Sequence, residues 1–314
     1  MYFDLHDSVK LYSAKKGIKV QFVERKSLDY ADQLRVKWWL AQGLYVKGAG
    51  IPWKINTTIP NTAYIGLGYA LKDGNTLLAA SQLFDERGQG LRVLMQPVRK
   101  HIVINKNPFM SKDDARRLIT TLRESYFSSG SNSKLDRIVI HKSNFFNRDE
   151  IEGITQALDG IQNVELLQIQ ESTLWKGLRW NSELRQGKWA SRDKNNPYHM
   201  FPLQRGAAIQ IDDFSALLWT DGSVQHPDLN NPKYNYYQSA RGIPSPLLLR
   251  RFHGTDPVDV LIKDILKLTK MNWNSGQLYK RLPVTIEFSK ILAEMAKQSE
   301  QLVGTYAYDF RYFI

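Results

Sequence analysis

Positively charged and aromatic side chains are interleaved at the start of the chain, and this mixture suits contact with nucleic acid. Residues 1–60 contain ten Lys or Arg residues but only five Asp or Glu residues. Cationic groups neutralise phosphates, and aromatic rings stack on bases. The adjacent Trp38 and Trp39 are nevertheless expected to be buried, since Trp is highly buried on average. The same expectation applies to Trp175, Trp180 and Trp189.

The composition of the whole chain supports this interpretation. The 314 residues include 43 Lys or Arg against 31 Asp or Glu, which gives a net charge of +12. Such a surplus favours a polyanionic partner, most commonly nucleic acid. With 42% hydrophobic residues the chain can bury a core. Since it has neither a run of about 18 apolar residues nor the apolar region of a signal peptide, we expect a cytoplasmic protein without a membrane segment.

Several kinds of chemistry lack the residues they need. The chain contains no Cys, which excludes disulfides, thiolate metal sites and a Cys nucleophile. His141, His199 and His253 are too dispersed in the sequence to indicate a metal site. No Ser, His and Asp residues have a spacing that identifies a catalytic triad.

The hydrophobic pattern predicts an α/β fold in two parts. The first part has a helix over 5–16, a strand over 18–23 and a helix over 31–47, which is half of an α/β domain. The second part begins with an antiparallel meander and continues with alternating helices and strands, in the order of an RNase H-like fold with a parallel βαβ part. Its expected meander strands are 63–71, 76–84 and 91–97. Its next elements are a helix at 111–127, a strand at 137–141, a helix at 148–158 and a strand at 164–170.

Further elements are expected towards the C-terminus. Strands are predicted at 207–211 and 215–220, and a last helix begins near Pro283. Another helix is expected to have Asp256 as its cap and Pro257 in its first position.

A nuclease of this fold needs carboxylates that hold two divalent cations around the scissile phosphate. One is expected in the middle of the first strand and another at the end of the strand that follows the crossover helix. The first strand instead reads AYIGLGY over 63–69, and the other ends in IHKSN over 140–144. Both places therefore lack the expected ligand.

Four segments have an order and spacing that resemble a prokaryotic Argonaute. They are GIKVQF at 17–22, YVKGAGIPW at 45–53, IVIHKSN at 138–144 and LPVTI at 282–286. The segment LTKMNWN at 268–274 is similar to Argonautes of the short, inactive branch. The resemblance implies the C-terminal part of a Rossmann-like MID domain over 1–55. It also implies an RNase H-like PIWI domain with a mixed sheet over 56–314.

The resemblance implies a site for the 5′ phosphate of a guide strand. The matching positions are His6, Lys10, Gln21 and Lys47, whose two ammonium groups and imidazole can neutralise a terminal phosphate. Many family members have Tyr in place of His6. A polar side chain is expected four residues before Lys47, where this chain has Gly43. The alternatives are a solvated helix face for Lys10 and Lys47, a partly exposed helical position for His6, and a hydrogen bond to a main-chain group for Gln21.

In this family a Mg²⁺ ion can bridge the 5′ phosphate and the C-terminal carboxylate. Ile314 would supply that carboxylate, with Gln21 beside it as a further metal ligand. Ile314 could also simply be an apolar tail packed into the core, which would not exclude a metal ion on its carboxylate.

The resemblance also identifies degenerate catalytic positions. The Asp residues of the family's catalytic tetrad correspond to Gly68 and Ser143, and its last ligand falls near Lys290. A cation at that place repels Mg²⁺. We therefore expect a catalytically inactive protein without nuclease activity.

The expected function is guide-directed nucleic-acid binding in prokaryotic immunity. The resemblance implies a guide RNA with a 5′ phosphate, a single-stranded DNA target, and a partner effector that carries an APAZ domain fused to a TIR, Sir2 or nuclease module. Guide–target pairing would activate that effector.

Two alternatives remain open from the sequence. One is an active guide-dependent nuclease that uses other carboxylates, such as Asp73, Asp85, Glu86, Asp212 and Asp213. The other is a scaffold subunit that binds no guide. The predicted MID portion is short for its family, so the chain is expected to be a fragment, a trimmed or mis-started chain, or half of a split protein.

Overall fold

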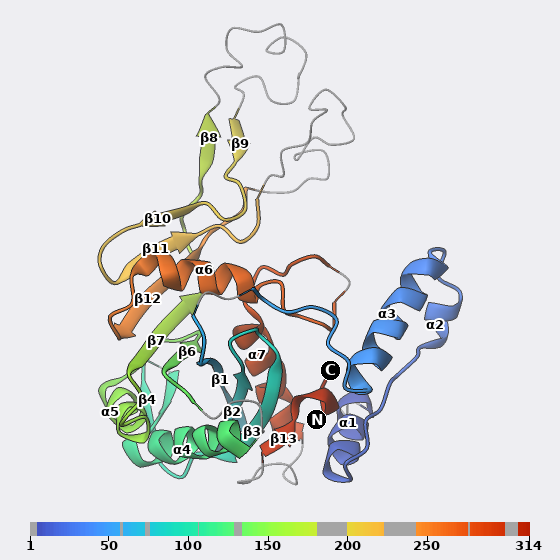
Figure 1. Ribbon diagram of the computed structural model, residues 1–314, viewed down its shortest axis with the longest axis horizontal. Coiled ribbons are helices and arrows are strands. Elements are labelled where there is room, and N and C mark those ends of the chain that lie inside the picture. The colour runs from blue at the N-terminus through green and yellow to red at the C-terminus, as the bar shows by residue number, and fades with distance from the viewer. Residues whose placement is uncertain are drawn as a thin grey trace, which may run out of the picture.

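The computed structural model describes residues 5–56, 59–72, 76–105, 107–128, 134–180, 200–222, 243–275, 277–298 and 307–314. The described part is built around one mixed sheet with the strand order β10-β11-β12-β7-β6-β1-β2-β3-β13 (Figure 1). Its strands are β1 (Thr62–Lys72), β2 (Thr76–Phe84), β3 (Gly90–Pro97), β6 (Arg137–Lys142), β7 (Asn163–Gln170), β10 (Ala208–Gln210), β11 (Ser215–Leu218), β12 (Leu247–His253) and β13 (Ala307–Asp309). Two hairpin-like pairs lie outside it: β4 (His101–Ile104) with β5 (Asn107–Met110), and β8 (Leu178–Trp180) with β9 (Met200–Pro202).

The centre of the sheet confirms the predicted topology. Strands β1, β2 and β3 form the antiparallel meander, and β6 pairs in parallel with β1 on one side and with β7 on the other. Helix α4 (Lys112–Ser128) connects the meander region to β6, and α5 (Arg148–Ala157) connects β6 to β7. This arrangement is the predicted βαβ unit.

Helices cover both faces of the sheet. Because side chains alternate along a strand, Ile65 and Leu67 of β1 pack with residues of α4 and α5, whereas Tyr64 packs on the other side with residues of α7 (Val284–Gln298). Helix α6 (Val258–Leu268) covers β7, β11 and β12 on the α7 side. The result is a three-layer α/β architecture.

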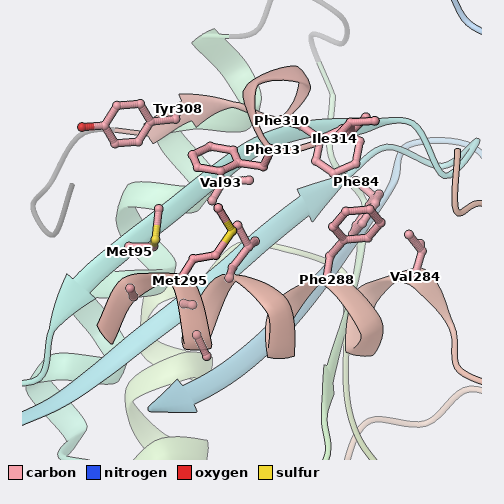
Figure 2. Packing of buried hydrophobic residues seen from close by; sticks show 14 of the residues in the cluster. Phe84, Val93, Met95, Val284, Phe288, Met295, Tyr308, Phe310, Phe313 and Ile314 are labelled. Carbon is pink, nitrogen blue, oxygen red and sulfur yellow. The ribbon is translucent and has the colours of Figure 1, made fainter. Parts of the chain in front are cut away.

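The end of the chain completes the core on the α7 side. Phe310 belongs to the 3₁₀ turn η5 (Phe310–Tyr312) and lies between Phe84 of β2 and Phe288 of α7 (Figure 2). The ring centroid of Phe310 is 6.0 Å from that of Phe84 and 5.1 Å from that of Phe288. Phe313 and Ile314 belong to the same buried cluster, together with Leu11 and Val46 from the N-terminal helices. The two ends of the described chain therefore meet in one core.

The N-terminal part is purely helical, which corrects the expectation of a strand over 18–23. It consists of α1 (Leu5–Lys15), α2 (Arg25–Leu28) and α3 (Gln33–Lys47). Residues 18–24 have no strand partner in the described chain, and a strand needs one for its main-chain groups. Side chains near this segment bond to nearby carbonyls instead: Lys19 to that of Lys47 and Gln21 to that of Phe22.

Several other expectations were wrong. Trp38 is 66% exposed, Trp39 39% and Trp175 58%, so these residues are not core residues. Trp189 and the side chain of Trp180 lie outside the part that the structure describes. Asp256 does not cap α6 with its side chain; the cap residue is Pro257, and the Asp256 carboxylate accepts hydrogen bonds from Arg137 and Asn163.

In the described residues, no helix combines the length and apolar character needed to cross a membrane.

Candidate nucleic-acid interface

The three strongest sequence candidates come together where α1, α3 and the end of the chain meet. Lys10 belongs to α1, and Lys47 is the last residue of α3. The ammonium group of Lys47 donates a hydrogen bond to Oε1 of Gln21 in the connecting segment. Lys10 is 7% exposed and Lys47 8%, so neither lies on a solvated helix face.

Gly43 makes room for this arrangement. A Cβ atom at position 43 would lie 2.9 Å from Oε1 of Gln21, closer than real Cβ contacts. The glycine therefore lets the Gln21 amide lie against α3 and meet Lys47 one turn further on. The resemblance implied a polar side chain at this position, whereas here Gln21 brings the polar group across from another segment.

Lys10 faces the end of the chain. Its Nζ atom is 3.5 Å from the main-chain carbonyl oxygen of Phe313, to which it donates. The side chain of Ile314 is 1% exposed and packs in the core, as expected for an apolar tail, which does not exclude a metal ion on its carboxylate. Figure 1 shows the C-terminus beside α1 and the C-terminal end of α3.

Two buried ammonium groups that lie close enough to interact electrostatically form an electropositive site. Burial, followed by the nearby charge of Lys10, lowers the pKa of Lys47 to about 8. Burial also lowers the pKa of Lys10, and the charge of Asp7 opposes that effect. Desolvated cations that repel each other gain most from an anion that accepts hydrogen bonds from both.

His6 lies at the edge of this group. Its ring is exposed and contacts the ring of Phe22, with the centroids 4.6 Å apart and the planes tilted by 48°. Its Nδ1 atom is 2.9 Å from a carboxylate oxygen of Asp7. These contacts hold His6 beside the segment that carries Gln21.

A cavity of about 710 Å³ adjoins Gln21 and Gly43, and sequence reasoning did not find it. Aromatic rings and cations line it from two distant parts of the chain. The guanidinium of Arg35 lies 4.6 Å from the ring centroid of Trp39, and Gln42 donates to the carbonyl of Trp273 at 2.6 Å. The mixture of cations and aromatic residues in 1–60 was the signal for it. The contribution of 273–280 could not be read from spacing.

The donor set fits a phosphate better than an isolated metal ion. The Gln21 oxygen is a ligand of the kind that Mg²⁺ takes, but it already accepts from Lys47. Two ammonium groups beside it repel a dication. Within the described residues, His, Asp and Glu form no group of three that could hold a metal ion.

The first degenerate catalytic position has no space for a side chain. Gly66 and Gly68 of β1 face α7, which approaches so closely that a Cβ atom at 66 would lie 2.0 Å from the carbonyl oxygen of Thr285. A Cβ atom at 68 would lie 2.4 Å from that of Ser289. The backbone of α7 therefore occupies the place where a carboxylate would project.

The other two degenerate positions are polar but not acidic. Ser143 is half-buried after β6, and its carbonyl accepts from Gln168 at 3.3 Å. Lys290 of α7 forms an ion pair with Glu171, which follows β7. Among the described residues, the ion pair of Glu171 is therefore made with a lysine at the degenerate catalytic position.

The alternative carboxylates are not gathered into a second centre in the described part. Asp85 is buried and accepts from the main-chain amides of Arg87 and Gln89, and Asp212 accepts from that of Phe214. These contacts stabilise turns. Asp73 lies outside the described residues.

Comparison with known proteins identifies relatives of the chain. No known family profile matches it. The Argonaute protein of Aquifex aeolicus (strain VF5) is 24% identical over 302 residues, which are 93% of this chain and 36% of that protein. A solved structure of the Aquifex aeolicus Argonaute matches with a TM-score of 0.64 and 20% identity over 100% of this chain and 40% of that one. The structure of the Clostridium butyricum Argonaute, bound to a guide DNA and a 19-mer target DNA, matches with a TM-score of 0.67 and 16% identity. That match covers 97% of this chain and 37% of the Clostridium chain.

The chain thus spans less than half the length of these relatives. Its mixed sheet and flanking helices have the RNase H-like fold of that part of the Argonautes. Over 93% of its length, the chain is a homologue of the Aquifex aeolicus Argonaute.

Proposed function

We propose that this protein binds a guide strand by its 5′ phosphate and uses it to capture a complementary target. The observation that carries the proposal is the meeting of two buried ammonium groups, Lys10 and Lys47, with the amide of Gln21. Lys10 and Lys47 donate to the phosphate oxygens. Gln21 orients Lys47 and donates through its amide NH₂ group.

The cavity beside Gln21 takes the base of the first guide nucleotide. It shares Gln21 and Gly43 with the phosphate site, and Phe22, Tyr30 and Trp39 offer rings for stacking. The first nucleotide can therefore place its phosphate on one side of Gln21 and its base in the cavity on the other side.

Target recognition is proposed to occur by base pairing, without cleavage. The loss of carboxylates at Gly68 and Ser143, and the Lys290–Glu171 ion pair, support inactivity as a nuclease. Gln21 and the carboxylate of Ile314 would hold a Mg²⁺ ion only together with the 5′ phosphate, whose charge the ion would offset.

Nucleic-acid partners are supported by the relatives. One solved structure of the Aquifex protein carries an externally bound siRNA, and the Clostridium structure carries guide and target DNA. For this chain we propose an RNA guide, a single-stranded DNA target, and activation of an associated effector protein in prokaryotic immunity. Helix α3 exposes Leu34 by 80% and Trp38 by 66%, which gives such a protein an apolar surface to dock on.

The experiment preloads the protein with a 5′-phosphorylated RNA guide and measures binding of a labelled single-stranded DNA. A complementary target should bind at least tenfold more tightly than a scrambled one, at equal salt. Equal affinity for both targets rejects guide-directed binding and favours a scaffold role. Products that appear only with Mg²⁺ or Mn²⁺ and a complementary guide would instead establish an active nuclease.

A further inference from the structure

Strand β10 leaves one edge of the main sheet open. It is the last strand on its side of the sheet, and in the described chain only β11 pairs with it (Figure 1). All three residues of the strand are exposed. Residues 207–211 read AAIQI and contain neither a charge nor a proline. Since charges and prolines are the usual protection of an edge strand, this edge is open to pairing with another strand.

Main-chain groups point away from the sheet at two positions of this edge. The carbonyl of Ala207 and the amide of Ile211 bond to main-chain groups at or next to the two ends of β11, both at 2.9 Å. The direction of these groups alternates along an antiparallel strand. Ala208 and Gln210 therefore direct their amides and carbonyls outwards. An extended strand is the partner whose own main-chain groups match this spacing.

Two isoleucine side chains lie on one face beside the open edge. Ile209 is 52% exposed and Ile211 50%, and residues two apart on an extended chain share a face. Ile209 lies opposite Leu217, which packs in a small buried cluster with Trp219 and Leu248. The isoleucines thus extend this apolar cluster to the edge, on the face that α6 does not cover.

The sequence of the edge is complementary to itself. When two copies of the strand run antiparallel with Gln210 at a two-fold axis, Ile209 of each copy lies opposite Ile211 of the other. These two pairs are of the type without main-chain hydrogen bonds, in which facing side chains approach most closely. All four isoleucines are then paired on one face. A two-fold contact of this kind ends with two copies.

The charges at the two ends of β10 favour the same antiparallel arrangement. Asp212 and Asp213 follow the strand and are exposed. Arg205 precedes the strand and donates to the carbonyl of Leu266 at 3.2 Å, which places the end of α6, with Lys267, at the other end of β10. An antiparallel pair puts the acidic end of each strand beside the basic end of the other. A parallel pair would put like charges together, which is unfavourable.

We propose that β10 is a self-association edge, through which a second copy of this chain extends the sheet with Gln210 at the two-fold axis. Such a short strand pair is expected to bury less than the roughly 1,200 Å² of a standard interface. The dimer should therefore be weak, with a dissociation constant of about 10–100 μM. The proposal does not depend on guide binding.

Engineered cysteines test the pairing and its register, since the chain has no Cys of its own. Differently tagged Ile209→Cys and Ile211→Cys chains are mixed and mildly oxidised. Their thiols face each other in the proposed register, so the mixed disulfide should form at least about tenfold faster than in a control mixture. The control pairs Ile211→Cys with Lys263→Cys, whose thiol is exposed on α6. Ile209→Cys alone should cross-link no faster than the control, and a faster reaction would overturn this register.

Sedimentation at increasing protein concentration measures the dimer without cross-linking. Ile209→Lys/Ile211→Lys should weaken self-association at least about tenfold, with an unchanged free energy of unfolding because both positions are exposed. The matched control, Ile102→Lys/Val103→Lys, makes the same change at exposed residues of β4 and should dimerise like wild type.

Four results would overturn the proposal. They are a wild-type protein that stays monomeric up to about 100 μM, assemblies larger than a dimer, equal self-association of the two lysine variants, and a mixed disulfide that forms no faster than the control. A β10 edge that pairs with a strand of a different protein would give the first and the last of these results.

Discussion

Lys47 and Gln21 are 26 residues apart, yet the ammonium group of one donates to the amide oxygen of the other beside α3. The contact depends on Gly43, because a Cβ atom there would lie 2.9 Å from the same oxygen. A polar side chain from one segment is thus positioned by the absence of a side chain in another. A substitution at Gly43 can therefore change the binding of a ligand at Gln21 and Lys47 without lowering the stability of the fold.

Gly43→Ala should weaken binding of the guide without weakening the fold. Alanine stabilises a helix interior by about 1 kcal/mol relative to glycine, while its methyl group displaces the Gln21 amide. We expect an unchanged or higher free energy of unfolding and a fivefold or greater loss of affinity for a 5′-phosphorylated strand. Because both residues act through one contact, Gln21→Ala and Gly43→Ala combined should cost no more than Gln21→Ala alone. Additive losses would show that Gly43 acts elsewhere.

Lys10→Met and Lys47→Met should each remove most of the preference for a 5′ phosphate. Each charge-assisted hydrogen bond contributes about 1.5–3 kcal/mol, so the affinity should fall at least tenfold for the phosphorylated strand. Affinity for the 5′-hydroxyl strand should change little. Lys37→Met is the matched control, since Lys37 is exposed on α3. If Lys37→Met loses as much affinity for the phosphorylated strand as the two site variants, the effect comes from the net charge of the protein and not from a phosphate site.

The 5′-phosphate preference should depend on pH with a maximum near neutrality. The pKa of Lys47 is lowered to about 8, so above that pH the free site loses the proton that phosphate binding requires. Below about pH 6 the phosphate itself gains a proton and loses charge. Titration of the ratio of the two affinities between pH 5.5 and 9.5 should therefore show two limbs. In Lys47→Met, the preference that remains should no longer fall near pH 8. A fall that persists there would be assigned to another group, such as Lys10, whose pKa is also lowered by burial.

Gly68→Asp should destabilise the protein without making it a nuclease. The new Cβ atom meets the α7 backbone at 2.4 Å, and the carboxylate is placed in a buried layer. Overpacking and burial of a charge together should cost about 3 kcal/mol or more in chemical denaturation. Ser143→Asp, at a half-buried position, should cost less. A Gly68→Asp variant of wild-type stability would mean that α7 moves aside easily.

The sequence predicted the centre of the sheet better than its edges. The apolar segments of β1 to β3, which are joined by short turns, and the apolar runs of β6 and β7 carried enough local signal for their order and direction. β12 was missed because its sequence, LLLRRFH, changes from apolar to cationic without alternation. β13 was missed because a strand of three residues is defined by its partner, β3, which lies some 200 positions away.

The candidate site was predicted by resemblance, residue by residue, but its environment was not. No spacing indicates that Lys10 donates to a carbonyl 303 positions later, or that Trp273 lines a cavity with Trp39. The exposure of Trp38 contradicted the prediction from residue type, because burial of a helix face depends on which other elements reach it.

The central claim is that the terminal phosphate anchors the guide. The most direct measurement is the ratio of dissociation constants of the wild-type protein for one RNA sequence with a 5′ hydroxyl and with a 5′ phosphate, at pH 7 and fixed salt. Two buried ammonium groups that gain an anion predict a ratio of at least about ten. A ratio of one, with both strands bound, would contradict the account.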